Sequence, residues 1–140
     1  DFIQKKPPKS TGRHEFGREV VVKLIQSFSQ ISPNDMIRTF CAFTARSIAE
    51  NLNKFLNFKL SNIRLIVSGG GVHHSVLLED IRKYTGISNF KTAAEYGIPS
   101  DTKEALLMAV LGTARIQKLP ANMPSVTGAE KMVALGDVLI

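Results

Sequence analysis

Three consecutive glycines, Gly69, Gly70 and Gly71, are the residues whose type and spacing most directly suggest chemistry. They lie in the stretch V-S-G-G-G-V-H-H-S, residues 67–75, between an apolar run and a pattern typical of a helix. Glycine costs backbone entropy, so three in a row must serve a tight turn, close backbone packing or a ligand against the main chain. The spacing matches neither G-x-G-x-x-G nor the P-loop pattern, so ligand binding and a purely structural turn both stay open.

Two histidines, His73 and His74, follow the glycines directly. Adjacent side chains rarely point at one metal ion, and no cluster of cysteine or carboxylate ligands accompanies them, so we predict no metal site. We expect instead that one of the pair caps the following helix or faces a ligand cleft.

Two further polar clusters could hold a ligand. Lys9, Ser10 and Thr11 combine a cation with two hydroxyls that could bind a phosphate or a sugar, but we favour a hydroxyl cap for the helix that follows. Asp101 and Glu104 open a later apolar segment with the spacing of a capping box. In the alternative interpretation, Glu104 points from the first helical turn into a cleft and binds the hydroxyls of a polyol or a water.

The elements that must position these residues are predicted from apolar periodicity and cap signals. Ser32 and Pro33 form a strong helix start. The helix over residues 13–28 is expected to have one buried face. The helix over residues 101–117 is apolar on nearly every side and is expected to be buried between other elements. The middle of the chain is typical of a parallel α/β unit, with too few strands for a whole sheet, so we expect a larger protein. Helices are predicted over residues 13–28, 33–55, 75–85 and 101–117, and strands over 62–68, 89–92 and within 134–140.

The composition is that of one globular domain, with 140 residues of which 44% are hydrophobic and 21% charged. No apolar stretch is long enough to cross a bilayer, and the polar, basic start is unlike a signal peptide. The single Cys41 cannot form an internal disulfide, which indicates a reducing, cytoplasmic compartment. The net charge of +6 allows a nucleic-acid partner, but the sequence has few aromatics and no nucleic-acid-binding motif, so we favour a solvated basic face.

Four motifs follow one another along nearly the whole chain. They are P-P-K-S-T-G-R-H-E-F at 7–16, I-V-S-G-G-G-V-H-H at 66–74, Y-G-I-P-S-D-T-K-E-A at 96–105, and L-P-A-N-M-P-S-V-T-G-A at 119–129 with A-L-G at 134–136. Together they resemble the C-terminal part of the anhydro-N-acetylmuramic acid kinase family.

The resemblance implies an α/β fold: the C-terminal lobe of an actin-like ATPase (sugar kinase) fold, with a small, mostly parallel sheet packed by long helices. Residues 1–12 would be an extended arm and 13–140 the nucleotide-binding lobe of a two-lobed kinase whose N-terminal lobe is absent. Members of the family use ATP and Mg²⁺ to open the 1,6-anhydro ring of anhydro-N-acetylmuramic acid with water and to phosphorylate the sugar at O6, in amino-sugar metabolism.

The resemblance also implies roles for single residues. The three glycines and His74 match the adenosine side of the nucleotide site, Glu104 matches a glutamate facing the sugar and water, and Lys9 to Thr11 belong to a signature of unassigned role. The family's general-base aspartate and phosphate loop lie upstream, so this chain is expected to hold no catalytic residue and to be inactive alone. Its expected partners are ATP, the anhydro amino sugar, its own N-terminal lobe and, as an open alternative, a second copy in a homodimer.

The sequence departs from the family at His74, where asparagine is usual, and at Ser75, where proline is frequent. Imidazole is bulkier than an amide and can carry charge. This departure favours an alternative function, a non-catalytic interaction or dimerisation module derived from the same fold. A third hypothesis, nucleic-acid binding through the basic arm, predicts strongly salt-dependent affinity.

Overall fold

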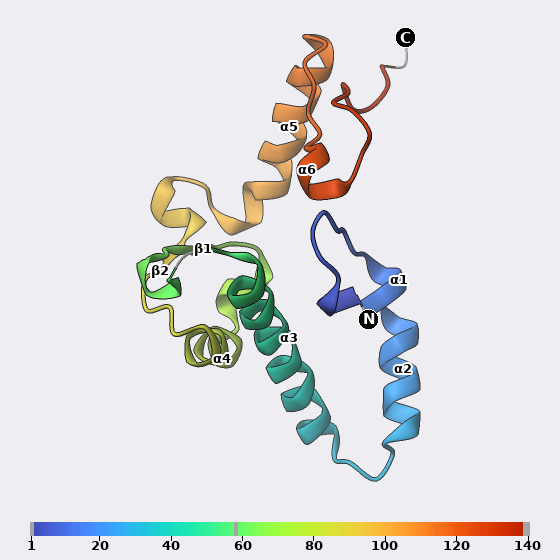
Figure 1. The fold of residues 1–140 in the computed structure, drawn as a ribbon, viewed down its shortest axis with the longest axis vertical. Helices are drawn as coiled ribbons and strands as arrows, with labels where there is room; N and C mark the ends of the chain where they lie inside the picture. Colours follow the sequence, from blue (N-terminus) through green and yellow to red (C-terminus); the bar gives the residue numbers. More distant parts are fainter. Residues whose placement is uncertain (1, 58, 139–140) are drawn as a thin grey trace.

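The computed structural model describes residues 2–57 and 59–138 and shows an α/β protein in which helices predominate (Figure 1). Two parallel strands, β1 (Leu65–Val67) and β2 (Phe90–Thr92), form a small sheet in which Leu65 pairs with Phe90. The chain passes from β1 to β2 through the glycines and helix α4 (Ser75–Thr85). The predicted parallel α/β unit is therefore confirmed.

The core lies where α3 (Pro33–Phe55) packs along α4 beside the sheet (Figure 1). Helix α3 begins as the sequence predicts, because the Ser32 hydroxyl oxygen accepts a hydrogen bond from the Asp35 backbone N–H at 3.1 Å. This core is small for a chain of this length. Its buried apolar residues are Met36, Ala45, Ala49, Leu60, Ile81, Ile87 and Ala93.

An ion pair between side chains far apart in the sequence joins α3 to α4. Arg38 donates from Nη1 to Asp80 Oδ2 at 2.5 Å and from Nη2 to Oδ1 at 2.8 Å. The carboxylate is buried while the guanidinium is about half exposed, and the hydrogen bonds to Asp80 raise the pKa of Arg38. The half-buried Cys41 thiol lies 3.9 Å from the same Oδ2, so it packs within this polar cluster.

The first predicted helix, residues 13–28, is broken in two at Gly17. Helix α1 (Arg13–Phe16) ends there and α2 (Arg18–Ser27) begins, with Gly17 in an extended conformation. A Cβ at Gly17 would lie 1.9 Å from the carbonyl oxygen of Arg13, so only glycine permits this close approach. The prediction of one continuous helix over residues 13–28 is therefore wrong, because the chain turns at Gly17 where only glycine fits.

Two helices expose the apolar side chains that their sequence patterns predict to be buried. Helix α2 has no buried residue, and Phe28, which follows it, is 44% exposed. Helix α5 (Lys103–Ile116) also has none; it follows the 3-10 turn η5 (Ser100–Thr102) and extends away from the sheet (Figure 1). Among the described helices and strands, α5 makes extensive contact only with η5. The predicted burial of both helices is therefore wrong within this chain, because the described residues provide no element that covers them.

Two predicted strands also change. The strand predicted over 62–68 is shortened to β1, because the 3-10 turn η2 (Leu60–Asn62) precedes it. The tail forms the short helix α6 (Pro124–Thr127), and residues 134–138 contain no strand, while 139 and 140 lie outside the described residues. Within the described ranges, no helix combines the length and apolar character that a membrane span requires.

Candidate functional site

The glycine turn, Gly69 to Gly71, leads from β1 through the 3-10 turn η3 (Gly70–His73) into α4. Gly69 has φ 77° and ψ −176°, a conformation that is essentially restricted to glycine. Gly70 and Gly71 have no positive φ. A Cβ on Gly70 would meet no described atom within 4 Å, and one on Gly71 would meet only Leu77 Cδ2 at 4.0 Å. The geometry of the turn therefore explains Gly69 but does not explain the other two.

His74 is the N-cap residue of α4. Its Nδ1 accepts a hydrogen bond from the Leu77 backbone N–H at 3.2 Å, so helix capping, one of the two expectations for the histidine pair, is met. Because Nδ1 is the acceptor, the imidazole carries its proton on Nε2. Asparagine is a preferred N-cap residue, so His74 performs a local role that asparagine can also perform.

Two charged side chains from the start of α5 lie beside the glycine turn. Lys103 Nζ would be 3.8 Å from a Cβ on Gly69, and Glu104 Oε1 lies 3.6 Å from the same Nζ. Contact between η3 and η5 brings the beginning of α5 to this end of the sheet. Glu104 is therefore linked to the glycine turn through the Lys103 ammonium group. Sequence reasoning missed Lys103, whose only signal was its position beside Glu104 in the same motif.

The predicted capping box at the start of α5 does not form. Thr102 is the N-cap residue and has no side-chain cap bond, while Asp101 lies one position earlier within η5. Glu104 therefore does not fold back on its own helix, and its side chain is 70% exposed. The carboxylate is thereby available to a group outside α5.

Lys9 joins the arm to α3. Its Nζ donates to the carbonyl oxygen of Ile3 at 2.9 Å and to Asn51 Oδ1 of α3 at 2.5 Å, and it lies 4.9 Å from the ring centroid of Phe55. These contacts fix the 3-10 turn η1 (Phe2–Gln4) against α3. They account for a lysine at this position without a ligand.

Thr11 supports the start of α1. Its hydroxyl donates to Glu15 Oε2 at 2.7 Å, and the Gly12 backbone N–H donates to the same oxygen at 3.3 Å. The Thr11 hydrogen bond, helped by Gly12 and by nearby His14, lowers the pKa of Glu15. The N-cap residue is Gly12 and not Ser10 or Thr11 as predicted. The partners found for Lys9 and Thr11 lie in the arm, α1 and α3, so the structure does not bring this cluster to the glycine turn.

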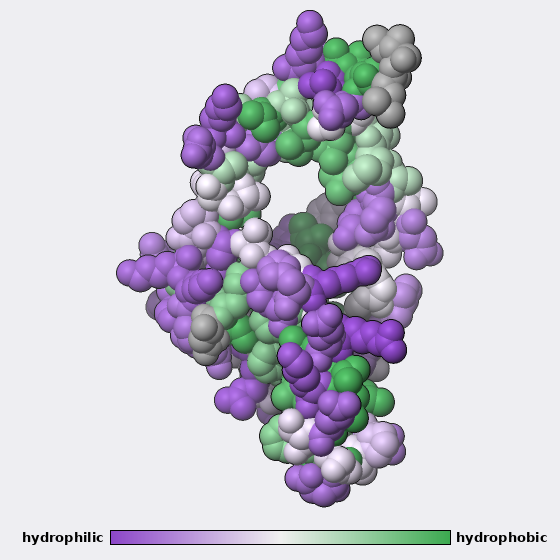
Figure 2. Space-filling view, turned by 90° about the vertical axis from the view of Figure 1, so that its right-hand side faces the viewer, coloured by the Kyte–Doolittle hydropathy of each residue, from purple (hydrophilic) through white to green (hydrophobic). Residues whose placement is uncertain are grey.

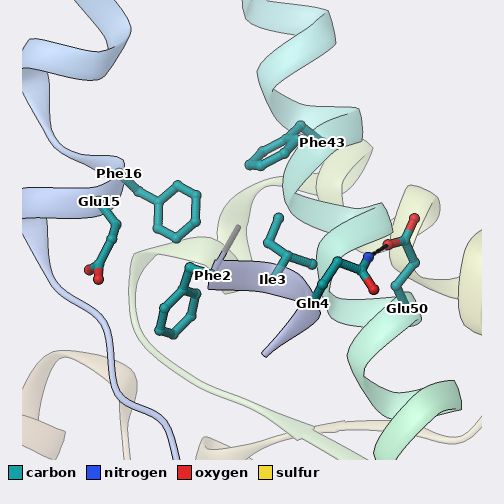
Figure 3. A pocket seen from close by; sticks show the side chains of 7 residues that line it. All are labelled: Phe2, Ile3, Gln4, Glu15, Phe16, Phe43 and Glu50. Carbon is teal, nitrogen blue, oxygen red and sulfur yellow. Dashed lines mark hydrogen bonds between the residues drawn. The ribbon is translucent and has the colours of Figure 1, made fainter. Parts of the chain in front are cut away.

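A hollow of about 400 Å³ lies between η1, α1 and α3 (Figure 3). Its polar side chains already have hydrogen-bond partners: Gln4 Nε2 donates to Glu50 Oε2 at 3.4 Å, and Glu15 accepts from Thr11 outside the hollow. Phe16 contacts two other aromatic rings, with centroids 6.0 and 6.1 Å away. We interpret the hollow as a packing feature of the arm. It is lined by Phe2, Ile3, Gln4, Glu15, Phe16, Phe43 and Glu50.

The order of strand, glycine turn and helix, with exposed backbone at the carboxyl end of a parallel strand, is typical of α/β proteins that bind ligands at the edge of a sheet. The sequence profile of one family within this class, described as anhydro-N-acetylmuramic acid kinase, matches residues 1–140. The chain belongs to this family, whose members are phosphotransferases.

Relatives from several bacteria carry the same name, anhydro-N-acetylmuramic acid kinase. The protein of Salinibacter ruber is 34% identical over 100% of this chain, that of Francisella tularensis subsp. novicida is 36% identical over 98%, and that of Mannheimia succiniciproducens is 38% identical over 96%. The chain spans only 36 to 37% of the length of these relatives. It therefore corresponds to a little more than a third of a full-length kinase of this family.

Proposed function

We propose that the full-length protein is an ATP-dependent kinase that opens the 1,6-anhydro ring of anhydro-N-acetylmuramic acid with water and phosphorylates O6. Membership of the family supports this reaction. The chain would be the C-terminal lobe of an actin-like sugar kinase fold, with an arm over residues 1–12 and the lobe over 13–140. The parallel β1–β2 unit supports this assignment, and a sheet of two strands needs more strands or packed helices from elsewhere to be stable.

The observation that carries the nucleotide site is the bare backbone of Gly70 and Gly71. Neither a positive φ nor a close neighbour among the described residues accounts for glycine at these two positions. Adenosine resting on their peptide groups would account for both, because a side chain would occupy the space of the ligand. His74 caps α4 directly behind the turn and would thereby hold the nucleotide-facing backbone in place.

Two side chains at the start of α5 would contact the phosphate and the sugar. Lys103 places a positive charge beside the glycine turn, where it would attract a nucleotide phosphate. Glu104 would bind a sugar hydroxyl or the attacking water, since its carboxylate is exposed and does not cap its own helix. These two neighbouring side chains would thus connect the two substrates.

The remaining chemistry is assigned to the rest of the full-length protein. Mg²⁺ in kinases is generally held by one or two carboxylates together with phosphate oxygens. Across residues 2–57 and 59–138, no group of three His, Cys, Asp or Glu side chains could hold a metal ion. From the resemblance to the family, we assign the Mg²⁺ ligands, the general-base aspartate and the phosphate loop to the N-terminal lobe, and we expect this chain alone to be inactive.

The alternative, a non-catalytic module, was favoured by His74 in place of asparagine. Because the imidazole caps α4 as an asparagine could, this substitution is compatible with an intact turn. To separate the two functions, full-length protein is incubated with ATP, Mg²⁺ and the anhydro sugar. The kinase predicts a 6-phosphorylated product and a higher melting temperature with ATP, since a ligand bound only to the native state stabilises it. Absence of both would favour the module.

A further inference from the structure

Helix α5 exposes apolar side chains around its whole circumference. Leu107 is 49% exposed, Met108 60% and Val110 57%. Ile116 is 78% exposed. Successive residues of an α-helix are rotated by about 100°, because a turn takes about 3.6 residues. Leu107, Met108 and Val110 therefore share one half of the helix, and Ile116 projects from the opposite side. A helix that is hydrophobic all round is typical of the interior of a larger protein.

The middle of α5 also lacks the charges of a solvated helix. Residues 105–114 read A-L-L-M-A-V-L-G-T-A, and the charged residues of α5 stand only near its two ends, at Lys103, Glu104 and Arg115. Burying this stretch would therefore desolvate no ionised group. Its transfer out of water is driven by the hydrophobic effect alone.

The apolar surface continues onto the segment that follows α5. Met123 is 62% exposed there, and a groove of about 360 Å³ lies beside the helix. Figure 2 shows hydrophobic side chains, among hydrophilic ones, in this upper part of the molecule, above an opening. The groove could receive a bulky apolar side chain. It is lined by Ala109, Val110, Thr113, Ala114, Gln117 and Leu119.

We propose that α5 is an internal docking helix, around which the rest of the full-length kinase polypeptide packs. This inference rests on the proposed function only in that a larger polypeptide exists. The chain spans 36% of its relatives' length, so most of a full-length kinase is available to cover the helix.

A second copy of the chain would cover α5 less completely than the rest of the full-length polypeptide. A two-fold dimer interface is one self-complementary patch on each protomer, so it covers one side of a helix. The exposed residues Leu107 and Ile116 lie on opposite sides of α5, and a dimer interface over one of them would leave the other in water. A polypeptide that folds around α5 can cover all of them.

The test uses full-length protein with a single cysteine introduced at the surface of α5. The variants are Leu107→Cys, Met108→Cys and Val110→Cys, and the matched control is Lys83→Cys on the exposed side of α4. Labelling by a polar maleimide is measured as the excess over the unsubstituted protein. We expect the three α5 thiols to react at least about tenfold more slowly than the control, at every protein concentration, because labelling requires local opening.

Amide hydrogen exchange of residues 105–114 in unsubstituted full-length protein gives a second readout if a cysteine variant fails to fold. Slow exchange that is independent of protein concentration supports the proposal. Labelling and exchange as fast as at exposed sites overturn it, and protection that is lost on dilution overturns it in favour of a second copy. Protection of α5 without ATP binding would contradict only the proposed nucleotide site.

Discussion

At the residue scale, the glycine turn combines two kinds of glycine. Gly69 is required by its own backbone, because φ 77° with ψ −176° is closed to residues that carry a Cβ. Gly70 has neither a positive φ nor a described neighbour within 4 Å of a Cβ. A run that looks uniform in the sequence therefore separates into a position that its own backbone explains and one that the described residues do not explain.

A substitution at Gly69 tests whether its backbone conformation requires glycine. Gly69→Ala should destabilise full-length protein by about 1–3 kcal/mol, because alanine is strained in this region. The measurement is equilibrium unfolding in urea. Gly70→Ala, measured without ligand, is the control, since Gly70 has no positive φ and a Cβ there meets no described atom within 4 Å. Equal stability of the two variants would show that Gly69 is not constrained.

Two glutamates should titrate below the ordinary value. The Thr11 hydrogen bond lowers the pKa of Glu15, and the Lys91 hydrogen bond at 2.6 Å lowers the pKa of Glu95. Because both folded pKa values lie below the unfolded value of about 4.3, their stabilisation is present above that pH and is lost as the pH falls through the folded pKa. Carboxyl NMR titration measures both.

The control for this titration is Lys91→Met. It should raise the pKa of Glu95 toward its ordinary value while leaving Glu15 unchanged, because the two carboxyls have different partners. A Glu95 that titrates identically with and without the lysine would refute the assigned cause.

The proposed role of Glu104 predicts a selective kinetic defect. Glu104→Gln in full-length protein should lower kcat/KM for the anhydro sugar by about tenfold or more, which is about 1.4 kcal/mol of lost transition-state stabilisation. The rise in melting temperature with ATP should persist. Asp101→Asn, at an exposed neighbour that caps no helix, is the control. An equal loss in both variants would indicate a general charge effect.

At the element scale, helices with strong local signals were the predictable ones. Helix α3 begins at the predicted Ser32 cap, and α4 spans the predicted residues 75–85, because capping and periodicity act within a few residues. The break at Gly17 depends on a contact with Arg13 that exists only once the turn has formed. Apolar spacing alone therefore favoured one helix.

Gly17→Ala should favour one continuous helix over residues 13–28. An added Cβ cannot remain 1.9 Å from the Arg13 carbonyl oxygen, so α1 and α2 must realign and move Phe16 away from Phe2 and Phe43. We expect a loss of about 1–3 kcal/mol, in the range of overpacked sites. Urea unfolding of full-length protein measures it, and unchanged stability would show that the break is not needed.

At the scale of the whole molecule, the sequence predicted the α/β class and its parallel strand pair better than it predicted which helices are buried. The contacts of Lys9 with Asn51, of Arg38 with Asp80 and of Lys103 with the glycine turn join residues distant in sequence, so no local pattern indicates them. The apolar pattern of α5 does describe a buried helix. The polypeptide that we propose to bury it lies outside this chain.

The central claim is that nucleotide lies on the backbone of Gly70 in the full-length kinase, and Gly70→Val tests it most directly. A Cβ there meets no described atom within 4 Å and φ is not positive, so the melting temperature without ligand should match that of the unsubstituted protein. The Kd for ATP, measured by calorimetry, should rise by about tenfold or more, equivalent to about 1.4 kcal/mol. An unchanged Kd in a folded Gly70→Val protein would contradict the claim.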